Sequence, residues 1–290
     1  MFRGEEIKNL VTLLERRGVS LFHACQYADF CTYLTLGGIP SRALLEQSKE
    51  PFTAFATDAH DRQNGVWDKV FVNLADFGEL FARRLQAVPN PYGPIVFQIR
   101  PSALVEADDV AICLRSAGAA DFNRQREALR GIDRIEELFL QSSDAGFPRS
   151  TYLKSMAQLR LLHPDARVPE VSCSIRRGFI PLENVIVIWT DPYVLDGHSL
   201  IHWIKDAIKK VGFDFPIWER SCCEDRRELY AELLDALRQH SPTLRQLSED
   251  VHRSPELRTW AVTILNRGLE YQFQRYQQYL KEGTLRSLIG

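Results

Sequence analysis

The sequence lacks any long run of apolar residues. A transmembrane helix needs about 20 consecutive residues that are mostly apolar, whereas the longest apolar stretch, around Val185 to Trp189, has only the length of a strand. The N-terminus carries Glu5 and Glu6 and has no apolar core, so it does not resemble a secretory signal peptide. These absences predict a cytoplasmic protein that makes no contact with a membrane.

Cysteine is scarce and irregularly spaced. The sequence has six cysteines and no Cys-x-x-Cys pair, and Cys222 directly precedes Cys223, where a disulfide between the two does not form easily. We therefore expect reduced thiols. We also predict no metal site, because structural zinc needs four ligands in a recognisable spacing and that spacing is missing.

Signature motifs of the common enzyme classes are missing as well. The sequence contains no P-loop, no Gly-x-Gly-x-x-Gly stretch, no His-Glu-x-x-His zinc motif and no Gly-x-Ser-x-Gly nucleophile elbow. The net charge is only −2, which argues against a protein that binds polyanions over its whole surface but leaves room for a local basic groove. With 45% apolar and 26% charged residues, the composition is that of a folded domain with a core.

What the chain does have is an alternation of short strands and helices. Residues Glu5–Arg16 place apolar side chains at helical spacing, and Ala28–Leu36 ends at a pair of glycines that suits a helix C-terminus. Runs rich in β-branched residues predict strands, and the polar segment 40–65 predicts a long loop. The predicted strands are 19–24, 70–72, 95–99, 110–114, 169–174 and 185–189, with an edge strand at 213–218; the further helices are 76–85, 121–140, 198–210 and most of 224–286.

This order of elements predicts an α+β protein. The strands fall between residues 19 and 190, and the chain beyond them is mostly helical. We therefore predict a domain over residues 1–195, which includes an N-terminal helix at 5–17, and a mostly helical C-terminal extension over residues 196–290.

Four stretches, in their order and spacing, resemble the DarT-type ADP-ribosyltransferases of the diphtheria-toxin and PARP-like superfamily. The first combines a strand, a histidine and a helix that ends in glycine. The fourth is a strand that begins with a glutamate and is followed by a turn. The stretches are Leu21–Phe30 with Leu34–Ile39, Lys69–Leu74, Tyr92–Phe97 with Ser116–Ala120, and Pro169–Ser174 with Ile180–Leu182, and together they span residues 20–192.

The resemblance implies a fold and a reaction. The fold is an ADP-ribosyltransferase-like split β-sheet core with flanking helices, to which this chain adds its helical C-terminal extension. The reaction is cleavage of NAD⁺, as co-substrate and without a metal, and transfer of its ADP-ribose to an acceptor.

Glu170 stands where the family places its catalytic carboxylate. Breaking the nicotinamide–ribose bond leaves the ribose electron-poor, and a carboxylate hydrogen-bonded to the ribose 2′-hydroxyl stabilises that charge as it develops. The same carboxylate can take a proton from the acceptor. Without the resemblance, Glu170 would be interpreted as a solvated residue at a strand edge, because most glutamates are exposed.

His23 resembles the family's histidine on the first strand, which hydrogen-bonds the ribose of the cofactor. An imidazole suits this role because one nitrogen donates while the other accepts, without added charge near neutral pH; the alternative is a core histidine. Gln26 and Asp29 depart from the His and Asn that relatives often have, although both can bond to hydroxyl groups.

An arginine near the cofactor would neutralise pyrophosphate charge. Arg42 and Arg62 both lie in the segment before the second core strand, and we favour Arg62 as the catalytic arginine because it is nearer that strand. Either residue can instead be a solvated loop residue. The predicted cofactor-binding residues are His23, Gln26, Asp29, Gly38, Arg42 and Phe71.

The segment before Glu170, residues 147–169, predicts the acceptor. It is basic with aromatic residues between the charges, which is typical of single-stranded nucleic acid binding, although an exposed helix would look similar. Val168 replaces the Gln or Glu that enzymes modifying arginine carry two positions before their catalytic glutamate, which argues against a protein arginine as acceptor. The predicted acceptor-binding residues are Arg149, Tyr152, Lys154, Arg160, His163 and Arg167.

Three hypotheses of function follow. The first is a mono-ADP-ribosyltransferase that modifies a nucleobase of single-stranded DNA or RNA, acting as a toxin or anti-phage effector restrained by an antitoxin protein. The second is modification of a protein side chain, or plain NAD⁺ hydrolysis. The third is a catalytically inactive NAD-binding or interaction module that acts through its C-terminal helices.

Overall fold

The structure is a computed structural model, and the residues that it describes form most of the first 220 positions of the chain. They are residues 1–53, 57–76, 92–119, 121–140, 153–154, 159, 161–163, 166, 169–192, 194–195 and 198–220. The helix predicted at 76–85, except for its first residue, and the helical segment predicted at 224–286 lie outside these ranges.

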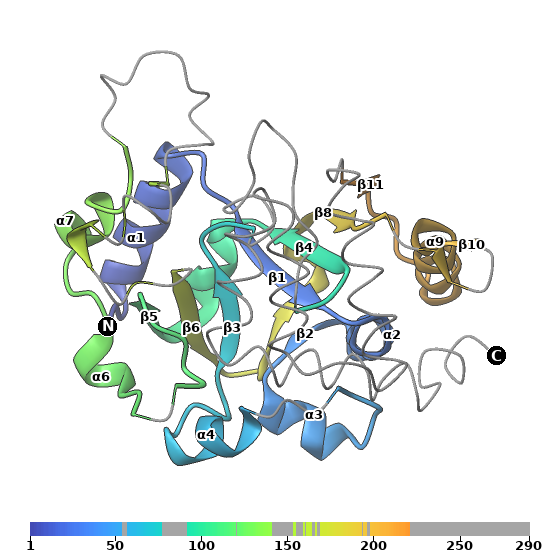
Figure 1. Cartoon of the computed structure of the whole chain (residues 1–290), viewed down its shortest axis with the longest axis horizontal. Helices are drawn as coiled ribbons and strands as arrows, with labels where there is room; N and C mark the ends of the chain where they lie inside the picture. Colours follow the sequence, from blue (N-terminus) through green and yellow to red (C-terminus); the bar gives the residue numbers. More distant parts are fainter. Residues whose placement is uncertain are drawn as a thin grey trace, which may run out of the picture.

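The described helices flank a large sheet (Figure 1). The α-helices are α1 (Glu5–Arg16), α2 (Tyr27–Leu36), α3 (Arg42–Ser48), α4 (Asp58–Gln63), α6 (Arg124–Glu127), α7 (Ile132–Glu136) and α9 (Leu200–Val211). Two 3₁₀ helices are η1 (Pro101–Glu106) and η3 (Leu182–Asn184).

The sheet has seven strands in the order β11-β8-β4-β1-β3-β6-β5, and all of its neighbours are antiparallel except β11 and β8. Its strands are β1 (Leu21–Cys25), β3 (Val70–Asn73), β4 (Ile95–Ile99), β5 (Ala107–Cys113), β6 (Glu170–Ile175), β8 (Val185–Thr190) and β11 (Ile217–Glu219). Two small ladders pair β2 (Gly38–Pro40) with β7 (Phe179–Pro181), and β9 (Val194–Leu195) with β10 (His198–Ser199). The α+β prediction is confirmed.

The sheet is divided into two wings between β1 and β3. Only one residue pair, Phe22 with Asn73, joins these two strands, whereas β1 pairs with β4 over five residues and β3 with β6 over four. One wing is therefore β11-β8-β4-β1 and the other is β3-β6-β5. We call the boundary between them the split, and it confirms the predicted split-sheet core.

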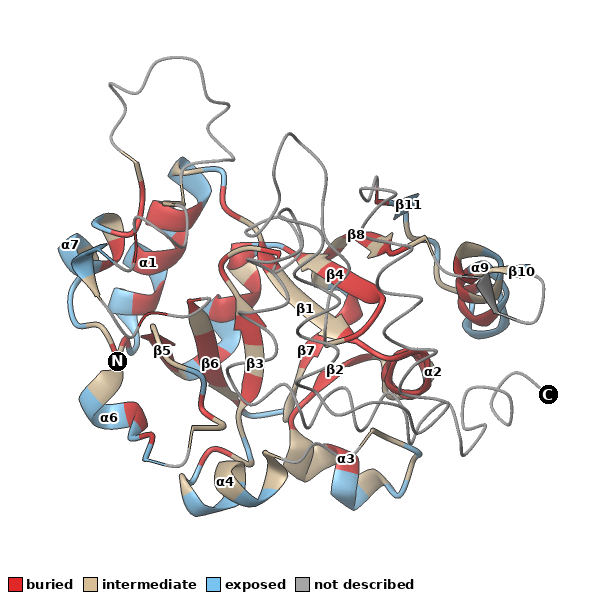
Figure 2. Ribbon diagram, viewed as in Figure 1, coloured by how far each residue is buried: buried red, intermediate tan, exposed pale blue. Residues whose placement is uncertain are grey.

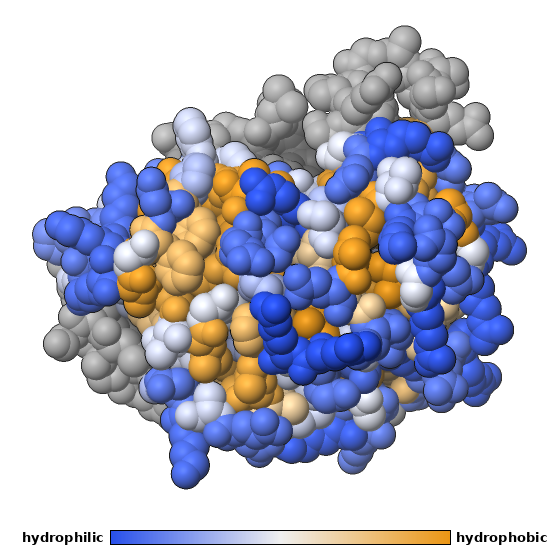
Figure 3. Space-filling model, turned by 180° about the vertical axis from the view of Figure 1, so that it is seen from behind, coloured by the Kyte–Doolittle hydropathy of each residue, from blue (hydrophilic) through white to orange (hydrophobic). Residues whose placement is uncertain are grey.

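The wings are held by one main apolar core (Figure 2). Helix α1 buries Leu10 and Leu14 fully against η1 and α7, as its helical spacing of apolar residues predicts. At the other end of the sheet, α9 packs against α2, where the Tyr27 hydroxyl donates to the Trp203 carbonyl at 3.2 Å. From behind, charged and apolar side chains are interspersed over the surface (Figure 3).

The prediction of a long loop at 40–65 is wrong. This segment contains α3 and α4, which lie side by side at one edge of the molecule (Figure 1). Ser41 caps α3 by accepting a hydrogen bond from the Leu44 N–H at 3.2 Å. The polar residues that suggest a loop are instead ion-pair partners and exposed faces of these short helices, such as Asp58, which binds Arg42.

The single helix predicted at 121–140 is also wrong. The structure has two short helices there, α6 and α7. Gly131 precedes α7 with a φ of 84°, a left-handed value that favours glycine, so it breaks the helix that the apolar spacing suggests.

The chain beyond the predicted boundary at 195 joins the same core up to residue 220. Helix α9 contributes Leu200 and Ile204 to the main core, and β11 extends the sheet at its edge, as predicted for 213–218. The division into two domains stays a prediction. Among the described residues, no helix is long and apolar enough to cross a membrane.

Candidate functional site

Glu170 opens β6 next to the split. In the sheet register Glu170 lies opposite Asn73 of β3 and Cys113 of β5, and Asn73 is the residue that pairs with Phe22 across the split. The Glu170 side chain is partly buried. Its Oε1 accepts a hydrogen bond from the backbone N–H of Ala117 at 2.8 Å, so the carboxylate has a fixed orientation rather than the free rotation of a surface glutamate.

The pKa of the Glu170 carboxyl is raised to about 7. Burial is the largest cause, and the negative charge of Asp61 adds to it. The Ala117 N–H and the Ser116 hydroxyl oppose the rise because they hydrogen-bond the ionised form. Near neutral pH, Glu170 therefore exists in both forms, which suits a group that stabilises positive charge or accepts a proton.

His23 bridges the split. Its Nδ1 lies 2.7 Å from the carbonyl oxygen of Phe71 on the other wing, and its Nε2 lies 3.3 Å from the Tyr33 hydroxyl. Because a carbonyl only accepts, Nδ1 carries the hydrogen and Nε2 presents a lone pair. Burial lowers the pKa of His23 to about 4, and the charge of Arg42 lowers it further. The imidazole is thus neutral, with one tautomer selected.

The two candidate arginines differ in their surroundings. Arg42 is nearly buried: its guanidinium donates to the Asp58 carboxylate at 2.7 and 2.9 Å and to the Thr53 carbonyl at 2.7 Å. Its charge reaches both His23 and Asp61, whose pKa values it lowers. Arg62 is half exposed, stacks on Trp67 and pairs with Glu46 at 2.9 Å. The charge of Arg42 therefore acts on His23, whereas the Arg62 guanidinium lies against Trp67 and Glu46.

Gln26 and Asp29 lie at the start of α2 and are both buried. The Gln26 side-chain N–H₂ is 3.4 Å from the Tyr92 carbonyl, and its Oε1 has no hydrogen-bond partner among the described residues. A buried amide oxygen without a partner is costly, so it is suited to accept from a bound ligand. Asp29 accepts from the Thr53 N–H at 2.6 Å, which ties α2 to the segment after α3.

Gly38 and Phe71 contribute to the site through their backbone atoms. A Cβ on Gly38 would meet the Phe179 ring at 2.0 Å, so glycine is required for the close pairing of β2 and β7. Phe71 contributes its carbonyl to His23 and packs its side chain against a second, smaller apolar cluster near Cys113.

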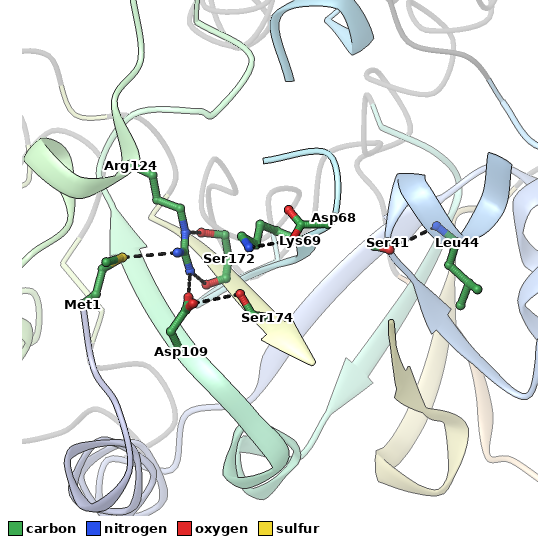
Figure 4. A network of polar contacts seen from close by, with 9 residues as sticks. All are labelled: Met1, Ser41, Leu44, Asp68, Lys69, Asp109, Arg124, Ser172 and Ser174. Carbon is green, nitrogen blue, oxygen red and sulfur yellow. Dashed lines mark hydrogen bonds and ion pairs between the residues drawn. The ribbon is translucent and has the colours of Figure 1, made fainter. Parts of the chain in front are cut away.

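Sequence analysis did not identify Arg124, which is buried against Ser172 and Asp109 (Figure 4). Arg124 donates to the hydroxyl of Ser172 at 2.8 Å and to its carbonyl at 2.9 Å, and also binds the Asp109 carboxylate. Ser172 is two residues after Glu170 on the same face of β6. The guanidinium thus fixes the strand that carries Glu170. An arginine in a polar stretch gives no sequence signal for burial.

Asp61 is the second residue that sequence analysis did not identify. It lies in α4, and burial together with the charge of Asp58 raises its pKa to about 6. Its charge in turn raises the pKa of Glu170, although the two residues are far apart in sequence. No group of three potential metal ligands occurs among the residues that the structure describes.

The predicted acceptor-binding residues are only partly described. Arg149, Tyr152, Arg160 and Arg167 lie outside the described residues. Lys154 donates to the Glu137 carbonyl at 2.7 Å, next to the end of α7. His163 ends a short helical turn, where its N–H donates to the Leu159 carbonyl at 2.8 Å.

Of the comparisons with known proteins, the one with solved structures finds matches. No family model matches the chain, and no curated protein does. Among solved structures, the chain is similar to Thermus sp. 2.9 DarT in complex with ADP-ribosylated ssDNA, with 12% identity, a TM-score of 0.41, and coverage of 70% of this chain and 94% of that chain. It is also similar to Thermus sp. 2.9 DarT in complex with NAD⁺, with 10% identity, a TM-score of 0.38, and coverage of 70% and 95%.

Both structures are of the family that the sequence resembles. Overlap at this level gives no ground for transferring residue roles, so the chemistry has to come from this chain's own side chains.

Proposed function

We propose that this protein is a mono-ADP-ribosyltransferase that cleaves NAD⁺, with Glu170 as the catalytic carboxylate. The observation that carries the proposal is the pair of groups at the split: a partly buried carboxylate oriented by a backbone N–H, and a neutral histidine whose tautomer is fixed across the same split. The four stretches of family resemblance support it, because they contain both of these residues.

The proposed chemistry uses each group in a form that the structure favours. The C1′–N bond of NAD⁺ breaks, nicotinamide leaves with the bonding electrons, and the acceptor then attacks C1′ and loses a proton. The ionised carboxylate of Glu170 accepts a hydrogen bond from the ribose 2′-hydroxyl, an interaction that strengthens as positive charge develops on the ribose. The Nε2 lone pair of His23, which lies 3.3 Å from the Tyr33 hydroxyl, would accept from another ribose hydroxyl in place of that O–H.

The cofactor site would be completed by residues around His23. Gln26 offers a partnerless amide oxygen, and Arg42 supplies positive charge for the pyrophosphate. Asp29, Gly38 and Phe71 hold the backbone on which these groups depend. Both guanidinium groups are paired, Arg42 with Asp58 and Arg62 with Glu46, and we place Arg42 before Arg62 because its charge lowers the pKa of His23.

The acceptor that we propose is a nucleobase in single-stranded DNA or RNA. Its support is the basic and aromatic composition of residues 147–169, directly before Glu170. The family resemblance adds a role as a cytoplasmic toxin or anti-phage effector that an antitoxin protein restrains. Expression of the wild-type chain alone should then arrest growth, while the Glu170→Gln variant is tolerated at an equal protein level.

The deciding experiment incubates the purified chain with NAD⁺ that is radiolabelled in its ADP-ribose. Separate reactions contain single-stranded DNA, total RNA and total protein, each beside the Glu170→Gln variant, which keeps the side-chain size and removes the charge. Label that enters a nucleic acid with the wild type alone is the expected result. Label in protein moves the acceptor to a side chain. Intact NAD⁺ in every reaction, with a folded protein, refutes the transferase and leaves the inactive binding module.

A further inference from the structure

Helix α4 and the residue that follows it hold a short loop by its carbonyl groups. Asn64 donates its side-chain N–H₂ to the carbonyls of Ala117 and Ala119 at 2.9 and 3.0 Å. His60 donates from Nδ1 to the intervening carbonyl of Gly118 at 2.9 Å. Three consecutive carbonyls, which we call the 117–119 loop, are therefore bound by side chains from one helix face, because residues four apart lie on the same side.

The contact between α4 and the 117–119 loop is close. A Cβ on Gly118 would lie 2.7 Å from the Thr57 methyl carbon and 2.8 Å from its Cβ. Such distances are far inside van der Waals contact, so the loop backbone rests directly on the start of α4. Glycine at 118 allows this approach.

The same loop orients Glu170. Ala117 accepts a hydrogen bond from Asn64 at its carbonyl and donates from its N–H to Glu170 Oε1 at 2.8 Å. The two peptide groups that flank Ala117 meet different partners, and a shift of the loop toward or away from α4 must change the hydrogen bond to Glu170. A continuous path of hydrogen bonds thus runs from Asn64 to the carboxylate.

Asp61 connects the same helix to Glu170 by a second route. It is three residues before Asn64 and so shares its helix face, and its charge acts on Glu170. Other groups on which the Glu170 charge acts are Tyr92, whose pKa burial raises further above its ordinary value, and Cys113, whose pKa burial raises to about 12. His60, next to Asp61 on α4, is a further titratable side chain at the 117–119 loop.

We propose that Asn64 is a positioning residue for Glu170, acting through the 117–119 loop. Asp61, three residues earlier on the same helix, is the comparison residue in its test. The inference rests on the proposed function only in treating Glu170 as the reacting carboxylate. The two residues act in opposite directions. Asn64 supports a hydrogen bond that favours the ionised carboxylate, while Asp61 repels the ionised carboxylate.

The test compares three variants with the wild type. Asn64→Leu keeps the side-chain volume and removes both donors, and Asp61→Asn removes the charge. Asn184→Leu is the matched control, because Asn184 also donates its side-chain N–H₂ to a backbone carbonyl, that of Pro181, but lies in η3 away from the 117–119 loop. For each, the Glu170 carboxyl is titrated by ¹³C NMR in glutamate-labelled protein, with Glu170→Gln identifying the signal, and kcat and KM for NAD⁺ cleavage are measured against pH.

Asn64→Leu should move the Glu170 midpoint above that of the wild type and lower kcat by about 10- to 100-fold with little change in KM. Asp61→Asn should move the midpoint below it, and Asn184→Leu should leave it in place. A merely structural role for Asn64 would lower stability without moving the midpoint. If Asn64→Leu does not fold, Gly118→Ala perturbs the same contact from the loop side and should raise the midpoint too.

An unchanged Glu170 midpoint and kcat in folded Asn64→Leu or Gly118→Ala protein overturns the inference. The NMR titration needs no turnover, so it separates the two proposals. If Asn64→Leu shifts the Glu170 midpoint but the wild type leaves NAD⁺ intact, the transferase is refuted and the positioning role is kept. If the wild type cleaves NAD⁺ and Asn64→Leu alters neither the cleavage nor the midpoint, the positioning role is refuted and the transferase is kept.

Discussion

Ionisation of the Glu170 carboxyl is unfavourable in the folded protein. Burial and the charge of Asp61 both disfavour the ionised carboxylate, and only the hydrogen bonds from Ala117 and Ser116 offset them. A surface glutamate would avoid this cost, so the folded protein would be more stable with a neutral side chain at this position when the pH is high. Residues placed against their own stability are common at functional sites, where the perturbed group has a chemical task.

This cost predicts a pH-dependent gain in stability for Glu170→Gln. The folded pKa of about 7 lies above the usual value of 4.5, so the wild type loses stability as the pH rises from 4.5 through 7. Below pH 4.5 both states are protonated and nothing is lost. In urea unfolding, Glu170→Gln should be more stable than the wild type at pH 8.5, by on the order of 1 to 3 kcal/mol, and equal to it at pH 4. A gain that is the same at both values would show that ionisation is not its cause.

At the scale of elements, the sequence predicts what depends on neighbours along the chain. The helix at Glu5–Arg16 and the strand at Ile95–Ile99 have the predicted bounds. The helix has apolar residues at regular helical spacing, and the strand is a short apolar run bounded by Pro94 and Arg100. The segment 40–65 was not predictable in this way. Its helices are six and seven residues long, and they depend on tertiary contacts such as Arg42 with Asp58 and Asn64 with the 117–119 loop.

The candidate site likewise contains residues that the local sequence predicts and residues that depend on distant partners. The sequence predicts Glu170 and His23 because each stands at the end or in the middle of a readable strand within the family pattern. Asp61 and Arg124 could not be found, because their importance comes from partners more than 40 positions away, such as Ser172 for Arg124. The choice between Arg42 and Arg62 also depends on folding of 40–65 and could not be made from proximity in sequence.

The arrangement of α3 and α4 predicts that Arg42 contributes more to NAD⁺ cleavage than Arg62 does. Arg42→Lys removes the guanidinium, one nitrogen of which donates to both carboxylate oxygens of Asp58 and to the Thr53 carbonyl, and should lower kcat/KM for NAD⁺ cleavage by about tenfold. Arg62→Lys keeps a charge near Glu46 on an exposed surface and should stay within about twofold of the wild type. Steady-state kinetics on both variants decides the matter. A larger loss for Arg62→Lys would return the catalytic role to that residue.

At the scale of the whole molecule, one buried cluster ties the edge strand to the centre. Arg220 directly follows β11 and binds the carboxylates of Asp76, after β3, and Asp191, after β8. All three side chains are almost fully buried. Because β3 and β8 belong to different wings, the guanidinium joins the two halves of the sheet in addition to the single Phe22–Asn73 pair.

Removing this guanidinium should destabilise the whole fold. Arg220→Met leaves two carboxylates buried without their shared cation, which costs about 3 to 5 kcal/mol in free energy of unfolding. Arg176→Gln breaks the exposed ion pair with Asp108 and should cost about 1 kcal/mol or less. Urea denaturation of both variants at neutral pH measures the difference. Equal, small losses would mean that the wings do not depend on this cluster.

The bridge that His23 makes between the wings has a consequence for communication within the sheet. Nδ1 donates to the Phe71 carbonyl of the β3 wing, and the Nε2 lone pair lies near the Tyr33 hydroxyl on the side of the other wing. A hydrogen bond made at one ring nitrogen polarises the ring and strengthens the bond at the other. A ligand that hydrogen-bonds to Nε2 should therefore also change the strength of the hydrogen bond from Nδ1 to the Phe71 carbonyl of β3, so that binding in one wing affects the backbone of the other.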